Sequence, residues 1–152
     1  MPRPQKRRIV NTPPLYSSFK PTGVMKRGLS QISFSLDEYE AVRLADYLKL
    51  EHEEAAAEME ISRSTFTRLL ERARNKVAAF LIEGKELSIQ GGSVHFRDNI
   101  MRCLGCGHIF NTDFESSLSV CPSCGSQDLL DIAGGFGHGR CCSRFSNAKD
   151  QE

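Results

Sequence analysis

Residues 52–71 restrict the possible folds of this chain more than any other stretch. Their sequence, HEEAAAEMEISRSTFTRLLE, places small and apolar residues at the spacing of two short amphipathic helices joined by a tight turn. Ala56 is small where the two helices would cross, and Ser62 is a favoured N-cap residue for the second helix. This pattern is typical of a helix-turn-helix, whose second helix enters the major groove of DNA.

The charges divide at the turn between these two helices. Residues 37–60 contain nine acidic and two basic residues, whereas residues 61–82 contain five basic residues and one acidic residue. A positive helix beside a negative support indicates a surface that faces phosphates. The residues expected to contact bases and phosphates are Arg63, Ser64, Thr67 and Arg68. Arg72 and Lys76 are assigned to backbone phosphates, with ordinary solvated charge as the alternative for both.

The flanking residues predict the rest of this domain. Ser35 and Glu38 form a capping-box pattern, so a helix should begin at residue 36. The second helix of the motif should span 52–59, and the third should run from Arg63 to about residue 82, before Gly84. Short strands are expected at 31–34 and 85–90 and could pair with each other. Glu60 occupies the turn position where a positive φ favours glycine.

Two pairs of cysteines in the last third of the chain have the spacing of metal ligands. Cys103 and Cys106 form CLGCGH, and Cys121 and Cys124 form CPSCGS. Two such C-x-x-C turns facing each other make a tetrahedral four-sulfur site, which zinc prefers and which iron could also occupy. Strands expected around 99–102, 108–110 and 128–132 complete a pattern typical of a zinc ribbon. The metal is expected to be structural and necessary for folding.

These segments predict a mainly α N-terminal helix-turn-helix domain, with three helices and short flanking strands, followed by a small β zinc ribbon. The chain of 152 residues is long enough for two such small domains. The expected boundaries are a basic, proline-rich arm at 1–31, the helix-turn-helix domain at 32–92, the zinc ribbon at 93–132 and a flexible tail at 133–152. The arm could lie along DNA or could simply be a solubilising terminus.

The tail contains His138, Cys141 and Cys142 in a glycine-rich context. Adjacent cysteines chelate one metal poorly by themselves, so a disordered end is the interpretation preferred over a weak metal site or a redox-reactive pair. Whether these three residues bind anything is left open.

Several functional classes are excluded or disfavoured. No apolar run reaches the roughly 20 residues that cross a bilayer, and the N-terminus lacks the apolar core of a signal peptide. Cysteines in C-x-x-C pairs without an export signal indicate metal thiolates in a cytoplasmic protein. No nucleophile with its base, paired carboxylates or phosphate-binding glycine loop is recognisable, so an enzyme is not expected.

Five segments together are similar to an uncharacterised family of prokaryotic predicted DNA-binding proteins. They are MPRP at the start, Phe19-Lys20-Pro21, LDEYEAVRLADY (36–47), EEAAAEMEISRSTFTRLLERARNKVA (53–78) and Gly91-Gly92. The helix-turn-helix of that family resembles the promoter-reading region four of bacterial sigma factors. The resemblance covers residues 1–92, with Glu60 as the departure where relatives would have glycine. It implies a transcription-associated protein without an established target.

Three hypotheses follow. The first is a sequence-specific transcriptional regulator that binds double-stranded DNA and carries a structural zinc site, with a homodimer as a further expectation. The second is an adaptor that docks on the transcription machinery, and the third is a metal or redox sensor that uses the cysteine-rich C-terminal region.

Overall fold

The computed structural model describes residues 7–115, 119–139 and 141–142. They form two compact units, each of which includes a piece from near the start of the chain. The N-terminal unit consists of the described residues up to Ile9 together with Tyr16–Val94. The C-terminal unit consists of Val10–Leu15 together with the described residues from His95 onward.

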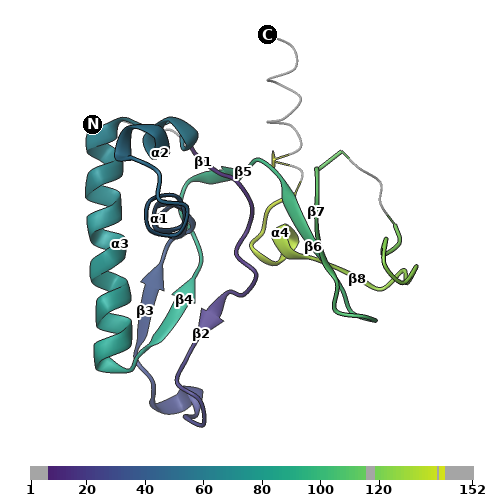
Figure 1. The fold of residues 1–152 in the computed structure, drawn as a ribbon. Helices are drawn as coiled ribbons and strands as arrows, with labels where there is room; N and C mark the ends of the chain where they lie inside the picture. Colours follow the sequence, from purple (N-terminus) through teal and green to yellow (C-terminus); the bar gives the residue numbers. More distant parts are fainter. Residues whose placement is uncertain (1–6, 116–118, 140, 143–152) are drawn as a thin grey trace. The chain divides into compact units, whose positions relative to one another are not determined.

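The helices of the N-terminal unit follow one another closely along the chain (Figure 1). They are α1 (Leu36–Val42), the π-helix η2 (Arg43–Tyr47), α2 (His52–Glu58) and α3 (Arg63–Glu83). No helix in the described part of the chain is both long enough and apolar enough to cross a bilayer.

The expected helix ends are confirmed at three positions. Ser35 caps α1 in a capping box, because its backbone amide donates to Glu38 Oε1 at 3.1 Å while its own hydroxyl accepts from the Glu38 amide. The Ser62 hydroxyl accepts a hydrogen bond from the Thr65 amide at 3.2 Å at the start of α3. Gly84 ends α3 with a φ of 65°.

The apolar faces of α1, η2, α2 and α3 meet in one core, as the periodicity predicts. Its buried members are Ala41, Leu44, Ala55, Ala56, Met59, Phe66, Leu69 and Leu70. Two of the three alanines of α2, Ala55 and Ala56, are buried and allow α3 to approach closely, and Phe66 is fully buried. The apolar stripe of α3 does not continue to its end, because Leu81 is 69% exposed.

A mixed three-stranded sheet lies in the same unit, in the order β2–β4–β3. Strand β3 (Gln31–Phe34) runs parallel to β4 (Glu86–Ile89), which confirms the expected pairing of these two segments. Strand β2 (Ser18–Phe19) adds to the other edge of β4 in the antiparallel sense. The short 3₁₀ helix η1 (Lys26–Gly28) lies between β2 and β3 in the chain.

The expectation of a mainly α domain with three helices is wrong. The described part of the chain contains four α-helices and three sheets, and strands are an integral part of the N-terminal unit. These strands are only two to four residues long, and β2 and β4 pair across 70 residues of sequence. Local periodicity cannot reveal such pairs, because two residues define no alternation.

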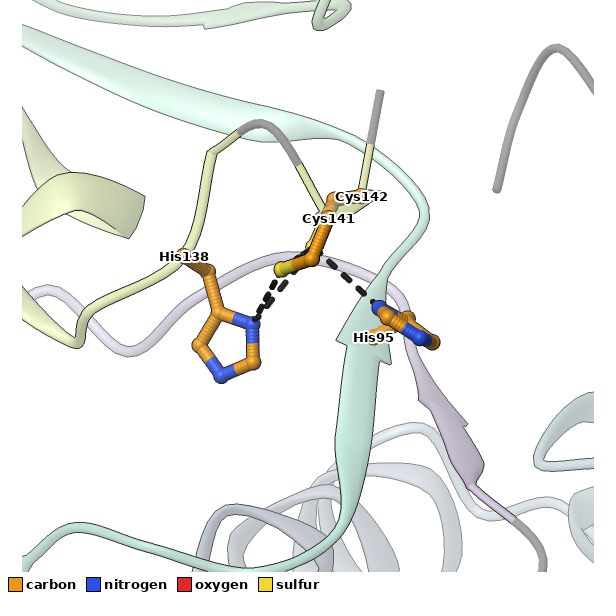
Figure 2. A group of neighbouring side chains, drawn as sticks. All are labelled: His95, His138, Cys141 and Cys142. Atoms are coloured by element: carbon orange, nitrogen blue, oxygen red, sulfur yellow. Dashed lines mark hydrogen bonds between the residues drawn. The ribbon is translucent and has the colours of Figure 1, made fainter. Parts of the chain in front are cut away.

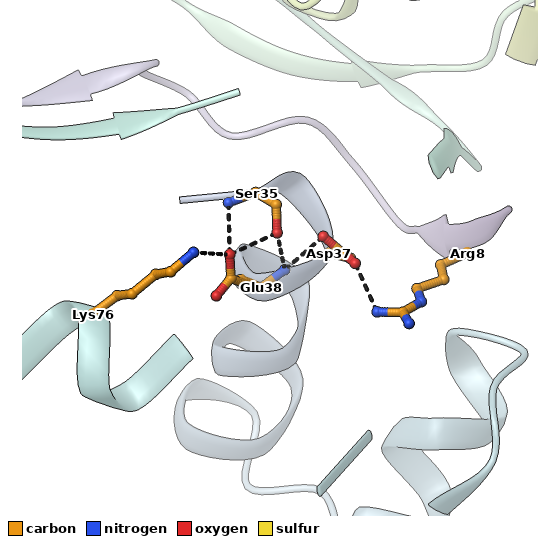
Figure 3. A network of polar contacts seen from close by, with 5 residues as sticks. All are labelled: Arg8, Ser35, Asp37, Glu38 and Lys76. Carbon is orange, nitrogen blue, oxygen red and sulfur yellow. Dashed lines mark hydrogen bonds and ion pairs between the residues drawn. The ribbon is translucent and has the colours of Figure 1, made fainter. Parts of the chain in front are cut away.

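Part of the segment expected to be a basic arm, Arg8–Val10, is packed into the fold. Strand β1 (Arg8–Val10) pairs with β5 (Val94–Phe96) in a two-stranded sheet. Ile9 and Val10 are buried, and the Arg8 guanidinium forms an ion pair with Asp37 at 2.7 Å (Figure 3). The part of the expected arm at residues 1–6 lies outside the described residues.

The C-terminal unit contains a three-stranded antiparallel sheet. Strand β6 (Asn99–Cys103) lies between β7 (Ile109–Thr112) and β8 (Leu129–Asp131), close to the three strands expected from the sequence. Helix α4 (Ile132–Gly135) follows β8 directly. Asn99 joins these elements, because its amide donates to Asp131 at 2.7 Å and its carbonyl oxygen accepts from the Ala133 backbone at 3.0 Å.

Candidate metal centre and nucleic-acid surface

The two C-x-x-C segments form turns of the same geometry. In the first, the Gly107 amide donates to the Cys103 carbonyl at 2.9 Å, and in the second the Gly125 amide donates to the Cys121 carbonyl at 2.9 Å. Both glycines have positive φ, 79° and 77° respectively, which explains the glycine after each second cysteine. Each turn therefore directs its two sulfurs toward the same point.

The four sulfurs gather at one point in the C-terminal unit. The Sγ atoms of Cys103 and Cys124 lie 3.5 Å apart, and those of Cys106 and Cys121 lie 3.7 Å apart. A tetrahedral ion with metal–sulfur bonds of about 2.3 Å would separate its sulfurs by about 3.8 Å. The donor set and its spacing fit a metal ion, and all four sulfurs lie within 4.8 Å of one another.

Backbone amides favour negative charge on these sulfurs. The Cys106 amide donates to Cys103 Sγ at 3.4 Å, and this contact is the main reason that the pKa of Cys103 falls to about 6. Burial opposes ionisation of Cys121 most strongly, but hydrogen bonds from the Cys124 and Ser123 amides and from the Cys106 and Cys124 side chains together lower the pKa of that thiol.

The pKa of Cys124 shows that neighbouring sulfurs oppose ionisation of this thiol. The Ser126 amide favours its ionisation, yet the neighbouring sulfurs of Cys103 and Cys106 outweigh this effect and raise the pKa of Cys124 to about 12. A bound cation would remove this mutual repulsion, because it neutralises the charge that four thiolates would accumulate.

The second candidate site is the turn from α2 into α3. Glu60 has a φ of 57°, as expected for this position, and the Ile61 amide donates to the Ala56 carbonyl at 3.0 Å. The Met59 carbonyl accepts from the Ile9 amide at 3.2 Å, so β1 also holds this turn. The start of α3 is thus fixed by backbone hydrogen bonds on both sides of Glu60.

The residues expected to contact DNA at the start of α3 all have exposed side chains. They are Arg63, Ser64, Thr67 and Arg68, and Arg72 is exposed one turn later. Among the described residues, no carboxylate forms an ion pair with any of these three arginines. The Thr67 hydroxyl lies 3.0 Å from His52 Nδ1, which links the start of α2 to the exposed side of α3.

Two other basic residues of α3 are held by carboxylates. Lys76, also expected to contact phosphates, is 37% exposed and places Nζ 2.7 Å from Glu38 Oε1 (Figure 3). The Arg74 guanidinium donates two hydrogen bonds to Asp46 and thereby lowers the pKa of that carboxyl. Among the described residues, the basic side chains of α3 without an ion pair therefore lie in its first three turns.

The structure also brings together residues that the sequence left unassigned. His138, Cys141 and Cys142 lie beside His95, which comes from β5 and which no sequence pattern connected with them. More than 40 residues separate His95 from this part of the tail, so only the fold reveals their proximity.

Comparison with known proteins places this chain in a family. The model of a family described as "Protein of unknown function DUF134" matches residues 1–97. A UPF0251 protein of Chloroherpeton thalassium is 50% identical over 92% of this chain and 95% of its own length. UPF0251 proteins of Chlorobaculum tepidum and Moorella thermoacetica are 43% and 42% identical, over 74% and 93% of their own lengths. No solved structure is significantly similar to the chain.

These matches confirm the resemblance to an uncharacterised family, and they extend it beyond residue 92 into the cysteine-rich region. The chain belongs to the UPF0251 family.

Proposed function

We propose that this protein binds double-stranded DNA sequence-specifically, as a transcriptional regulator, with α2 and α3 acting as a helix-turn-helix. One observation carries this proposal: Arg63, Arg68 and Arg72 are exposed on α3 and form no ion pair among the described residues. The same unit contains many carboxylates, yet these arginines are left available to an anionic partner.

The chemistry of the exposed residues suits a base-reading helix. Arginine can donate two hydrogen bonds to one guanine, while the hydroxyls of Ser64 and Thr67 can contact bases or phosphates. The first turn of α3 also carries the positive end of the helix dipole, which favours a phosphate there. Because Phe66 and Leu69 are buried on the other side of α3, the helix can insert as a rigid element.

We further propose that the four-cysteine cluster of Cys103, Cys106, Cys121 and Cys124 holds zinc in a structural role. Four thiolates fill the tetrahedral coordination of zinc and leave no position for a substrate or an activated water. The C-terminal unit would then have the role of a zinc-ribbon-like module whose folding depends on the metal.

A salt-dependent binding experiment tests the DNA proposal. Duplexes selected from a random pool by the zinc-loaded protein are labelled and titrated at several salt concentrations, and affinity should fall steeply as salt rises. Arg68→Ala should weaken binding to the selected site by about 1–3 kcal/mol, roughly 5- to 150-fold, since a bidentate contact is lost. Arg72→Ala should reduce the slope of log affinity against log salt by about one.

Lys85→Ala is the control, because it also removes one positive charge, from a half-buried lysine outside the proposed surface. Lys85 lies just beyond the far end of α3, about 30 Å along the helix from Arg63. It should leave affinity and salt slope almost unchanged. Absence of binding by the zinc-loaded protein, or equal losses for Arg68→Ala and Lys85→Ala, would refute the proposed surface.

A further inference from the structure

A second cluster of potential metal ligands lies in the C-terminal unit, apart from the four-cysteine site. Its members are His95 on β5, His138 after α4, and the adjacent Cys141 and Cys142 (Figure 2). His95 is 5% exposed and Cys142 is fully buried, while His138 and Cys141 are half-buried. One donor atom from each residue lies within 4.8 Å of all the others.

The donor atoms have the spacing of a tetrahedral centre with two sulfurs and two nitrogens. Metal–sulfur bonds of about 2.3 Å and metal–nitrogen bonds of about 2.05 Å imply sulfur–sulfur and sulfur–nitrogen separations of about 3.8 and 3.6 Å. The two sulfurs lie 3.8 Å apart. His138 Nδ1 lies 3.3 Å from Cys141 Sγ and 3.6 Å from Cys142 Sγ, and His95 Nδ1 lies 3.9 Å from Cys142 Sγ.

The surrounding residues fix these ligands in place. The Phe96 amide donates to Cys142 Sγ at 3.2 Å, a contact that favours the thiolate that a metal requires. The His138 amide donates to the Ala133 carbonyl at 3.0 Å, which holds the histidine to α4. The His138 ring also packs edge-on against Phe96, with centroids 4.9 Å apart.

We propose that His95, His138, Cys141 and Cys142 form a second zinc site of the two-cysteine, two-histidine type. Adjacent cysteines alone are a poor chelate, but here two histidines from other segments complete the coordination. Two thiols would release their protons on binding, so Zn²⁺ with two thiolates and two neutral imidazoles carries no net charge. A neutral centre suits the burial of His95 and Cys142, since a buried net charge is costly.

The site would be structural and would tie the C-terminal segment to β5. All four coordination positions come from the protein, so none remains for a substrate. The inference does not depend on DNA binding, and it requires only that the C-terminal unit folds with its own ligands in place.

Metal stoichiometry of the full chain tests this inference. Native mass spectrometry of the reduced, zinc-loaded protein should give two zinc ions per chain, one for each cluster. His138→Ala should bind one, whereas His108→Ala, which removes an exposed histidine outside both clusters, should still bind two. Cys106→Ser should also lose one ion, and the combination of Cys106→Ser with His138→Ala should lose both.

Cobalt substitution of the unaltered protein keeps the test decisive if a variant fails to fold. At saturation, the absorption spectrum of bound Co²⁺ should show the bands of two tetrahedral centres. One has four sulfur ligands, and the other has two sulfurs and two nitrogens. Binding of a single ion that Cys106→Ser abolishes, or a spectrum of the four-sulfur centre alone, would overturn the second site. A disulfide between Cys141 and Cys142 that persists after treatment with a reducing agent would overturn the second site as well.

Discussion

At the residue scale, Glu60 departs from the rule that glycine usually occupies a position of positive φ. Its φ of 57° lies in the left-handed region, where a Cβ atom is disfavoured by roughly 1–2 kcal/mol. The turn keeps this conformation because the Met59, Glu60 and Ile61 amides are all bonded to carbonyls of α2. These local hydrogen bonds therefore hold the backbone shape that a glycine would adopt freely.

Glu60→Gly should be more stable than Glu60→Ala by about 1 kcal/mol, because glycine relieves the strain at positive φ while alanine keeps it. Both variants remove the glutamate side chain, so their difference isolates the backbone effect. Urea unfolding of the zinc-loaded proteins, followed by circular dichroism, gives the comparison. Equal stability of the two variants would show that the turn is not strained at this position.

At the element scale, α1 and α3 are joined by an ion pair as well as by their apolar faces. Glu38 is buried, and its Oε1 atom accepts from the Ser35 amide, the Ser35 hydroxyl and Lys76 Nζ (Figure 3). Among the described residues, its Oε2 atom has no hydrogen-bond partner. Lys76 thus supplies the opposite charge to a carboxylate that is largely removed from water.

Lys76→Met should destabilise the N-terminal unit by about 1–2 kcal/mol, because it leaves the buried Glu38 carboxylate without its cation. Lys85→Met is a close control. Both lysine side chains are 37% exposed and both pair with a carboxylate at 2.7 Å, but the partner of Lys85 is 51% exposed and that of Lys76 only 5%. The control should therefore change stability by less than about 0.5 kcal/mol.

Chemical denaturation of the two lysine variants measures this difference directly. A loss of similar size in both would mean that burial of the partner does not determine the strength of these pairs. The sequence analysis assigns Lys76 to a phosphate contact. The stability of Lys76→Met therefore also shows whether this lysine serves the fold through Glu38.

At the scale of the whole molecule, the two units differ in the side chains that they bury. The N-terminal unit has a continuous apolar core that includes Phe66, Met59 and three leucines. Among the described residues of the C-terminal unit the buried side chains are fewer, and several of them are cysteines, including Cys103, Cys121 and Cys142. With the proposed zinc ions bound, a unit of this kind would gain most of its folding free energy from the metal.

Removal of metal by a strong chelator should therefore unfold the C-terminal unit and leave the helices of the N-terminal unit in place. Apparent zinc binding of about 10–16 kcal/mol is comparable to the whole stability of an ordinary domain. In amide NMR spectra, signals of β6, β7 and β8 should collapse to the range of unfolded chains, while helical circular dichroism persists. Zinc should restore them. Loss of both units together, or of neither, would contradict this division.

The sequence by itself determined the local features of this protein. The capping box at Ser35, the N-cap at Ser62, the end of α3 at Gly84 and the positive φ at Glu60 all follow from neighbouring residues. The four-cysteine cluster was predictable for the same reason, because each C-x-x-C turn sets the positions of its own two sulfurs.

Only the tertiary structure decided how distant segments combine. It paired β2 with β4, packed Arg8–Val10 against β5, and placed His95 beside Cys141 and Cys142. It also paired Arg74 and Lys76 with carboxylates of other helices, while the other three arginines of α3 form no ion pair among the described residues. These outcomes depend on contacts between residues tens of positions apart, and such contacts leave no periodic signal in the residues that make them.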